Sequence, residues 1–204
     1  MKSKIKVAIT GGIGSGKSTV SKYISDLGYP VFSCDEIYKK IYATDDFQNR
    51  LEVAFPTCLK NGKVDKSLLA QLVFSHSSAL RQLNRLSHPP IMAELFLQMQ
   101  AAESELVFAE VPLLMEENLD EDFDFVIVVL RDKEKRIKAI CERDQTSRAA
   151  AEARMKNQWN YDLPENKTKL SQDKFFVVEN NATEQHLQSN VEKIIPQLID
   201  RMKQ

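Results

Sequence analysis

The sequence contains little cysteine, glycine or proline, and each shortage excludes a class of protein. Its three cysteines, Cys34, Cys58 and Cys141, are odd in number and follow no paired spacing, which excludes a disulfide framework and a CxxC metal site. Six glycines and seven prolines in 204 residues exclude a collagen-like or low-complexity chain. No stretch approaches the roughly 20 apolar residues that cross a bilayer. The apolar run after the basic residues 1–6 is too short for a signal peptide. We therefore expect a cytoplasmic protein with reduced thiols and no membrane partner.

Charge of either sign is not in excess, because the formal net charge is -1 and the isoelectric point is near 6.3. A balance this close to neutral gives no reason to expect nucleic acid as a partner. Hydrophobic residues make up 43% of the chain, which is typical of a globular protein with a substantial core. The length suits one domain with room for a small inserted lobe.

Short apolar runs alternate with amphipathic stretches along most of the chain, which predicts an α/β fold. Between residues 45 and 103 the pattern is almost wholly helical, with Pro89 and Pro90 in the first turn of a helix Ile91–Ala102. We interpret this interruption as an inserted helical lobe. The expected strands are Ile5–Thr10, Tyr29–Phe32, Leu106–Glu110, Phe125–Leu130 and Phe175–Val178. The expected helices outside the lobe are Lys17–Leu27, Asp35–Tyr42, Asp132–Arg143, Ser147–Trp159 and Thr183–Met202.

A glycine-rich segment between the first strand and the first helix matches G-x-x-x-x-G-K-[ST] at every fixed position. Glycines let the backbone wrap a phosphate with its N–H groups, and the helix N-terminus adds partial positive charge. Lys17 would reach the outer phosphates, and Ser18 would bind magnesium through its hydroxyl. The alternative is a glycine-rich turn that binds nothing. The predicted nucleotide-binding residues are Gly12, Ile13, Gly14, Ser15, Gly16, Lys17, Ser18 and Thr19.

The residues after the last expected strand help to distinguish between classes of nucleotide-binding protein. A GTPase needs a guanine-reading N-K-x-D segment there, and Val178–Ala182 has neither the lysine nor the aspartate. The chain is short for a motor or transport ATPase. A small phosphotransferase with an acceptor lobe and an arginine-bearing lid fits the length best.

Five landmarks are spread along the chain. They are Ala8–Thr19, Asp35 at the end of Val31–Asp35, Leu86-Ser87-His88-Pro89, Pro112-Leu113-Leu114-Met115-Glu116, and Arg143-Asp144 followed by Arg154 and Gln158. With these landmarks the sequence resembles the dephospho-coenzyme A kinase family over nearly its whole length. The resemblance implies transfer of the ATP γ-phosphate to the ribose 3′-hydroxyl of dephospho-coenzyme A, with Mg²⁺, as the last step of coenzyme A synthesis.

The resemblance also implies a fold and an assignment of residues. The fold is a three-layer P-loop kinase core with a parallel five-stranded sheet over residues 1–44, 105–131 and 174–204, an acceptor-binding helical lobe over 45–104 and a helical lid over 132–173. We expect a monomer or weak homo-oligomer. The expected catalytic residues are Asp35, Lys17 and Arg143. We expect ATP to be bound also by Arg143 and Asn180, and the acceptor to be bound by Asp35, Lys39 and His88. The expected metal ligands are Ser18 and Glu110.

Each of these side chains also has a structural interpretation. Asp35 could cap its helix, Glu110 could be an ion-pair partner, and His88 could cap a helix that starts beside Pro89. Arg143 could be a solvated arginine paired with Glu142 or Asp144. Arg148 and Arg154 are further candidates for the lid.

The sequence departs from the family pattern in three places. Ser33-Cys34-Asp35 stands where the family has Asp-Ala-Asp, Lys39 stands where it has an arginine, and Asn181-Ala182 stands where a glycine often follows the asparagine. Lysine keeps the charge but loses the bidentate geometry of arginine. Two other functions remain open: a kinase for another small acceptor on the same core, and a nucleotide sensor that binds ATP without turnover. Substrate profiling separates the first from the leading hypothesis, and an ATP-consumption assay separates the second.

Overall fold

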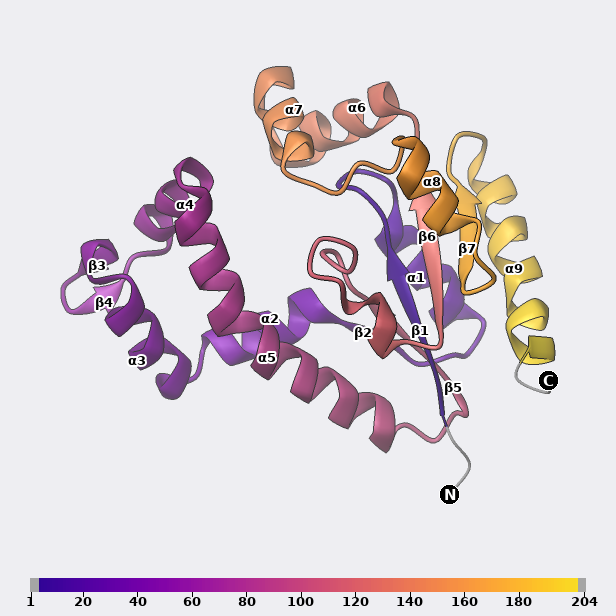
Figure 1. Cartoon of the computed structure of the whole chain (residues 1–204), viewed down its shortest axis with the longest axis horizontal. Helices are drawn as coiled ribbons and strands as arrows, with labels where there is room; N and C mark the ends of the chain where they lie inside the picture. Colours follow the sequence, from indigo (N-terminus) through magenta and orange to yellow (C-terminus); the bar gives the residue numbers. More distant parts are fainter. Residues whose placement is uncertain (1–3, 202–204) are drawn as a thin grey trace. The chain divides into compact units, whose positions relative to one another are not determined.

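The computed structural model describes residues 4–201, which divide into two compact units. The first unit comprises residues 4–32 and 99–201, and the second comprises residues 33–98. Figure 1 labels the strands of the first unit's sheet β1, β2, β5, β6 and β7, and those of a small hairpin in the second unit β3 and β4.

The first unit is built on a parallel five-stranded sheet in the order β2-β5-β1-β6-β7. This sheet confirms the predicted α/β fold. Because parallel strands all point the same way, the loops that follow them gather at one edge, where α/β proteins bind ligands. The elements are β1 (Ile5–Thr10), α1 (Lys17–Asp26), β2 (Val31–Ser33), β5 (Leu106–Glu110), the 3₁₀ turn η2 (Leu119–Asp122), β6 (Phe125–Leu130), α6 (Lys133–Asp144), α7 (Arg148–Lys156), α8 (Pro164–Leu170), β7 (Phe175–Glu179) and α9 (Glu184–Arg201).

Both faces of this sheet are buried, as parallel sheets require. On one face, Val7 and Ile9 of β1 pack in a core with residues of α1 and α9, and Figure 1 shows α9 running beside β7. On the other face, Ala8 of β1 and Val107 of β5 are fully buried. The register pairs Ile9 with Glu110, so β1 and β5 end side by side. The loop after β1 is thereby fixed next to the carboxylate that ends β5.

The second unit is mainly helical and has a core of its own, centred on Phe47, Leu51 and Phe55. Its long helix α5 carries buried Ser87 and Ile91 on either side of a proline pair. The elements are α2 (Cys34–Tyr42), α3 (Asp45–Ala54), the 3₁₀ turn η1 (Pro56–Cys58), β3 (Leu59–Lys60), β4 (Lys63–Val64), α4 (Lys66–Ser75) and α5 (Ser77–Ala101), whose last residues belong to the first unit.

Several predicted elements differ from the structure. No new helix starts at Pro89 and Pro90: α5 runs through both residues, because the φ angle of proline suits a helix and buried side chains on both sides hold the helix together. The stretch predicted to be almost wholly helical contains the antiparallel β3–β4 hairpin. The short helix α8 was not predicted. Met202, the predicted end of the last helix, lies outside the described residues.

Within residues 4–201, no helix is both long enough and apolar enough to cross a membrane.

Candidate active site

The loop Gly11–Gly16 joins β1 to α1 and carries three of the chain's left-handed glycines. Gly11, Gly14 and Gly16 have φ angles of 143°, 77° and 98°. Gly16 is the N-cap of α1, and Thr19 in the first turn donates its N–H to the Gly16 carbonyl at 3.1 Å. The N-terminus of a helix carries partial positive charge, so the start of α1 can bind an anion.

The carbonyl groups of this loop accept hydrogen bonds from side chains. Lys17 Nζ donates to the carbonyls of Gly11 at 2.9 Å and Gly12 at 3.3 Å. Three further side chains donate to the next three carbonyls in turn: Arg136 Nε to Ile13 at 2.9 Å, Arg131 Nη1 to Gly14 at 3.3 Å, and Asn180 Nδ2 to Ser15 at 2.8 Å. Two N–H groups of the loop are also committed, that of Ile13 to Gln158 Oε1 and that of Ser15 to the Gly12 carbonyl. The backbone is thereby held in a curved loop, the shape from which phosphate cradles are built.

Close packing explains two of the glycines. A Cβ atom at Gly14 would lie 2.7 Å from the Arg136 carbonyl oxygen, and one at Gly16 would lie 2.3 Å from Asn180 Nδ2. Any side chain at either position would displace α6 or the loop after β7. The glycine pattern therefore reflects the elements packed against the loop as well as space for a ligand.

Glu110 at the end of β5 lies beside the first turns of α1. Its Oε1 accepts from Ser18 Oγ at 2.9 Å and its Oε2 from Ser21 Oγ at 2.8 Å. The two residues predicted to bind a metal are therefore in direct contact. A carboxylate and a hydroxyl are hard oxygen donors of the kind Mg²⁺ takes alongside water and substrate phosphates, so this pair fits that ion.

A cavity of about 330 Å³ borders the loop at Ser15. Burial lowers the pKa of Arg136 at its wall, although nearby Tyr161 and Asp162 oppose the shift. Burial also raises the pKa of Tyr161, helped by the charge of Glu116. Tyr161 is thus a neutral wall residue at physiological pH. The remaining lining residues come from the ends of β6 and β7 and from α6 and α8: Val129, Leu130, Arg131, Asp132, Lys133, Lys167, Glu179 and Asn181.

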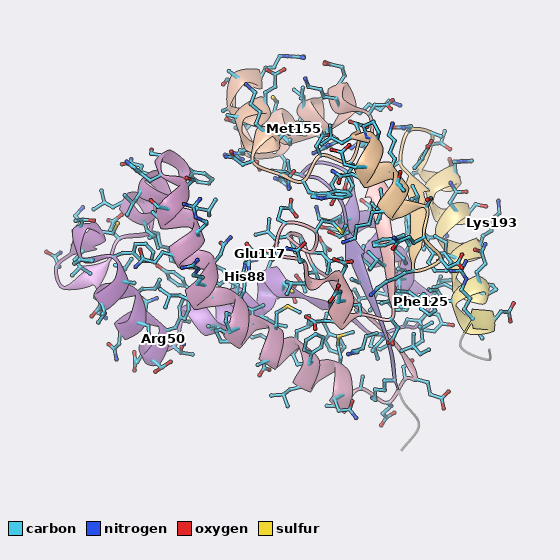
Figure 2. The ribbon with its side chains drawn as sticks, in the orientation of Figure 1. Arg50, His88, Glu117, Phe125, Met155 and Lys193 are labelled. Atoms are coloured by element: carbon cyan, nitrogen blue, oxygen red, sulfur yellow. The ribbon has the colours of Figure 1, made fainter. Side chains whose placement is uncertain are left out.

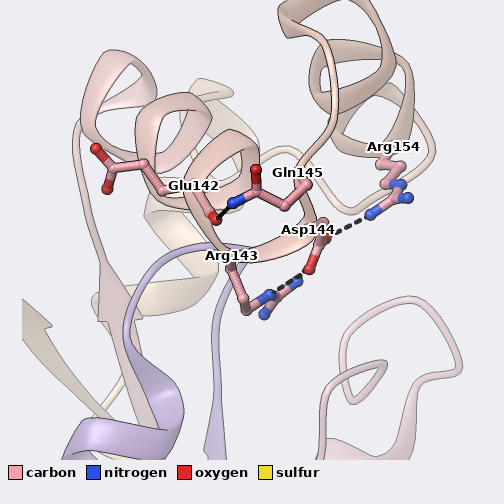
Figure 3. Close-up of polar contacts among 5 residues, drawn as sticks. All are labelled: Glu142, Arg143, Asp144, Gln145 and Arg154. Atoms are coloured by element: carbon pink, nitrogen blue, oxygen red, sulfur yellow. Dashed lines mark hydrogen bonds and ion pairs between the residues drawn. The ribbon is translucent and has the colours of Figure 1, made fainter.

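Arg143 lies at the joint between α6 and α7, where it forms a bidentate pair with its neighbour Asp144 (Figure 3). The Nε–Oδ1 and Nη2–Oδ2 distances are 2.7 and 3.0 Å, and Arg154 Nη1 contacts the same carboxylate at 2.6 Å. The hydrogen bond from Arg143 lowers the pKa of Asp144, with a further contribution from the charge of Arg154. Arg148 pairs instead with Glu134 on α6, at 2.7 Å. Arg148 and Arg154 of α7 thus join that helix to α6, whereas the Arg143–Asp144 pair lies within α6.

Asp35, Lys39 and His88 belong to the second unit. Asp35 is exposed in the first turn of α2, but the helix is capped by Ser33, whose Oγ accepts from Glu36 N at 3.4 Å. The interpretation of Asp35 as a helix cap is therefore wrong, because Ser33 takes that role. His88 is half-buried within α5 and not at a helix start, as Figure 2 shows.

A second cavity, of about 340 Å³, lies within the second unit between α2, α4 and α5. Lys39 is at its wall, and Lys66 lies 4.5 Å above the ring of Tyr42. The Tyr42 hydroxyl is buried without a hydrogen-bond partner in the described part of the chain. The other walls are mostly apolar: Tyr38, Leu69, Ala70, Val73, Phe74 and Leu83.

Sequence reasoning missed Arg136 and gave Gln158 no role. Arg136 lies in a run of charged residues that is typical of a solvated helix face. From the sequence alone, an arginine that contacts the loop cannot be distinguished from the solvated charged residues beside it. The usable signal is topological: α6 follows β6 directly, and β6 is the sheet neighbour of β1. A helix in that place starts next to the loop after β1.

Comparison with known proteins adds a family to this geometry. The family model described as dephospho-CoA kinase matches residues 5–186. A dephospho-CoA kinase from Fusobacterium nucleatum is 32% identical over 189 residues, which cover 92% of this chain and 95% of that protein.

Two solved structures are similar over nearly their full length. A Thermus thermophilus protein has a TM-score of 0.81 at 30% identity, covering 97% of this chain and 99% of its own. A dephospho-CoA kinase from Campylobacter jejuni has a TM-score of 0.65 at 31% identity, covering 95% and 96%.

Proposed function

The chain belongs to the dephospho-CoA kinase family, and from this premise we propose that it transfers the γ-phosphate of ATP to the ribose 3′-hydroxyl of dephospho-coenzyme A. The products are coenzyme A and ADP. The family match over residues 5–186 carries this proposal, because it spans the loop, Glu110, the α6–α7 joint and the whole second unit.

The first unit supplies the ATP site. The loop and the N-terminus of α1 bind the phosphates, with Gly12 to Thr19 as the contact segment. Lys17 exchanges its two carbonyl partners for phosphate oxygens, and Asn180 shapes the loop through Ser15. The cavity of about 330 Å³ beside Ser15 takes the nucleoside end.

Ser18 and Glu110 hold Mg²⁺ in this proposal. When bound, the ion neutralises charge on the transferring phosphoryl group. The direct contact of the Glu110 carboxylate with the Ser18 hydroxyl supports this assignment, and the Ser21 hydroxyl holds the same carboxylate beside α1.

The second unit supplies the acceptor site. The carboxylate of Asp35 is exposed and free of the capping role, so it can accept the proton of the 3′-hydroxyl. Lys39 and His88 bind the acceptor, and the cavity beside Lys39 has apolar walls suited to the pantetheine arm of dephospho-coenzyme A. In the first unit, Arg143 acts as a lid residue that leaves Asp144 for phosphate.

The decisive test is product analysis by mass spectrometry. Incubation with ATP, Mg²⁺ and dephospho-coenzyme A should yield a product that co-elutes with coenzyme A, which identifies the 3′-hydroxyl as the acceptor. Phosphorylation of a different small acceptor, with dephospho-coenzyme A left intact, would overturn the proposal. ATP binding without consumption in the presence of dephospho-coenzyme A would instead indicate a sensor.

A further inference from the structure

Ile13, at the tip of the phosphate loop, is held by side chains from outside the loop on both sides of its backbone. Its N–H donates to Gln158 Oε1 at 2.6 Å, and its carbonyl accepts from Arg136 Nε at 2.9 Å. Arg136 Nη2 also donates to Gln158 Oε1, at 3.3 Å. The three residues therefore close a ring of hydrogen bonds, which we call the Ile13 clamp.

The side chain of Ile13 is held as well. It packs against a small core formed by Ile137 and Ile140 of α6 and Ala151 of α7, with Cys141 and Met155 at its edge. The residue after Gln158 is also anchored, because Trp159 N donates to Glu116 Oε1 at 3.0 Å. The backbone and the side chain of Ile13 are thus fixed by the same two helices and the segment after them.

We propose that Gln158 is a positioning residue for the nucleotide, acting through Ile13 and supported by Arg136. Because the Ile13 N–H donates to Gln158, the Ile13 peptide is turned away from the phosphate-binding side of the loop. Phosphate is then bound at the N-terminus of α1. With the loop shape fixed before ATP arrives, binding does not have to order it.

The clamp also links the lid to the loop. Gln158 follows α7 directly, and Arg136 is in the first turn of α6, so any movement of these helices is transmitted to the Ile13 peptide. The proposal rests on the ATP site of the proposed function but not on the identity of the acceptor. Gln158 does not touch the reacting atoms in this scheme.

Gln158→Met tests the clamp, because methionine matches glutamine in length and lacks the carbonyl acceptor. We expect the Kd for ADP, measured by calorimetry, to rise about tenfold, the size of effect typical of one lost hydrogen bond in a binding loop. Hydrogen exchange of a peptide covering residues 11–18 should become faster in the protein without nucleotide. The KM for dephospho-coenzyme A should stay within about twofold of wild type, since the acceptor site is not altered.

Gln158→Glu is the conservative partner. Its carboxylate oxygen can accept the same two hydrogen bonds and pairs with the Arg136 guanidinium, so ADP affinity should return to within about threefold of wild type. Gln188→Met, on the exposed face of α9, is the matched control and should leave both readouts unchanged.

Wild-type ADP affinity in Gln158→Met, or equal losses in Gln158→Met and Gln158→Glu, would overturn the proposal. A purely structural role for Gln158 would lower the melting temperature and leave the Kd of the folded protein unchanged, and this result also overturns it. If the wild-type protein does not bind ADP, the proposed function fails, and the exchange rate of residues 11–18 still decides whether the clamp exists.

Discussion

The ammonium group of Lys17 rests on the carbonyls of Gly11 and Gly12, a position from which it can turn into the cradle. In the proposed function, Lys17→Ala removes a charge that would follow the β- and γ-phosphates into the transition state. We expect a higher Kd for ATP and a lower kcat. Calorimetry and steady-state kinetics with varied ATP measure both effects.

Lys22→Ala is the matched control for this change. Lys22 is also on α1, but it is exposed and pairs with Asp26 in a surface i,i+4 contact, at 2.5 Å. Such pairs contribute about 0.3–0.5 kcal/mol to stability and nothing to a distant site. If Lys17→Ala changed only the KM for the acceptor, the assignment of the loop to ATP would be wrong.

The carboxylate of Asp35 stands one residue after the start of α2, and the cap provided by Ser33 makes its removal easy to interpret. Asp35→Asn keeps the shape and the cap but loses the proton acceptor. We expect kcat to fall by about 10²–10⁴-fold while the affinity for ATP is retained. Rapid-quench or steady-state kinetics, with ATP binding measured separately, test this.

Glu36→Gln provides the comparison for Asp35→Asn, because Glu36 is the adjacent exposed acid in the same first turn. It removes the same charge from the N-terminus of α2, so any effect of the helix dipole appears in both variants. Equal rates in the two variants would leave Asp35 without a catalytic role.

At the scale of single residues, the sequence was informative where chemistry demands a fixed spacing. The loop motif located Lys17 and Ser18, and the expected metal pair Ser18 and Glu110 is in contact. Spacing could not reveal Arg136 or Gln158, since their role depends on which strand lies beside β1. A hydrogen bond across 145 residues of chain leaves no local pattern.

At the scale of elements, the errors have local causes. The hairpin β3–β4 has strands of two residues each, too short to show alternation, although Asn61-Gly62 supplies the turn with φ angles of 55° and 78°. Such an Asn-Gly pair is a strong hairpin signal that was overlooked in the helical pattern around it. The proline pair has the opposite effect on the prediction, because it indicates the start of a new helix where α5 continues. Buried side chains on both sides of Pro89 stabilise the helix by more than the two missing N–H donors destabilise it.

If the joint between α6 and α7 closes during phosphoryl transfer, Arg143 acts at this joint. Its guanidinium is paired with Asp144 here, so a role in catalysis requires it to exchange that carboxylate for phosphate. Arg143→Ala should then lower kcat with a smaller change in the Kd for ATP, since the contact forms mainly in the transition state. Steady-state kinetics and calorimetry on the same preparations separate the two quantities.

Arg143→Lys should recover only part of the rate, because a point charge replaces a bidentate fork. Arg148→Lys is the comparison: Arg148 is held by Glu134 and Glu152 on the same pair of helices. An unchanged kcat in Arg143→Ala would reduce Arg143 to a surface ion pair and leave the lid role to Arg148 or Arg154.

At the scale of the whole molecule, the two units have separate hydrophobic cores, one around Val7 and Ile9 and the other around Phe47 and Leu51. Each unit can therefore respond to its own ligand by local stabilisation. The sequence predicts a helical lobe over residues 45–104 from a break in the strand–helix alternation, whereas the second unit comprises residues 33–98 and begins at Ser33, at the end of a strand of the sheet.

If ATP binds the first unit and the acceptor binds the second, hydrogen exchange should report the two events in different segments. ADP alone should slow exchange in residues 11–18, where bound phosphate shields the backbone N–H groups from water. Adding dephospho-coenzyme A to the ADP-saturated protein should then slow exchange in residues 33–98, around Lys39 and Tyr42 at the wall of the second cavity. Saturating ADP is needed because the acceptor carries an adenosine diphosphate of its own, which would otherwise compete for the loop.

In Lys17→Ala the slowing of exchange in residues 11–18 should shrink, and the slowing in residues 33–98 should persist at high acceptor concentration. Protection confined to residues 11–18 under both conditions would show that the second unit does not bind the acceptor, whatever the activity of the enzyme.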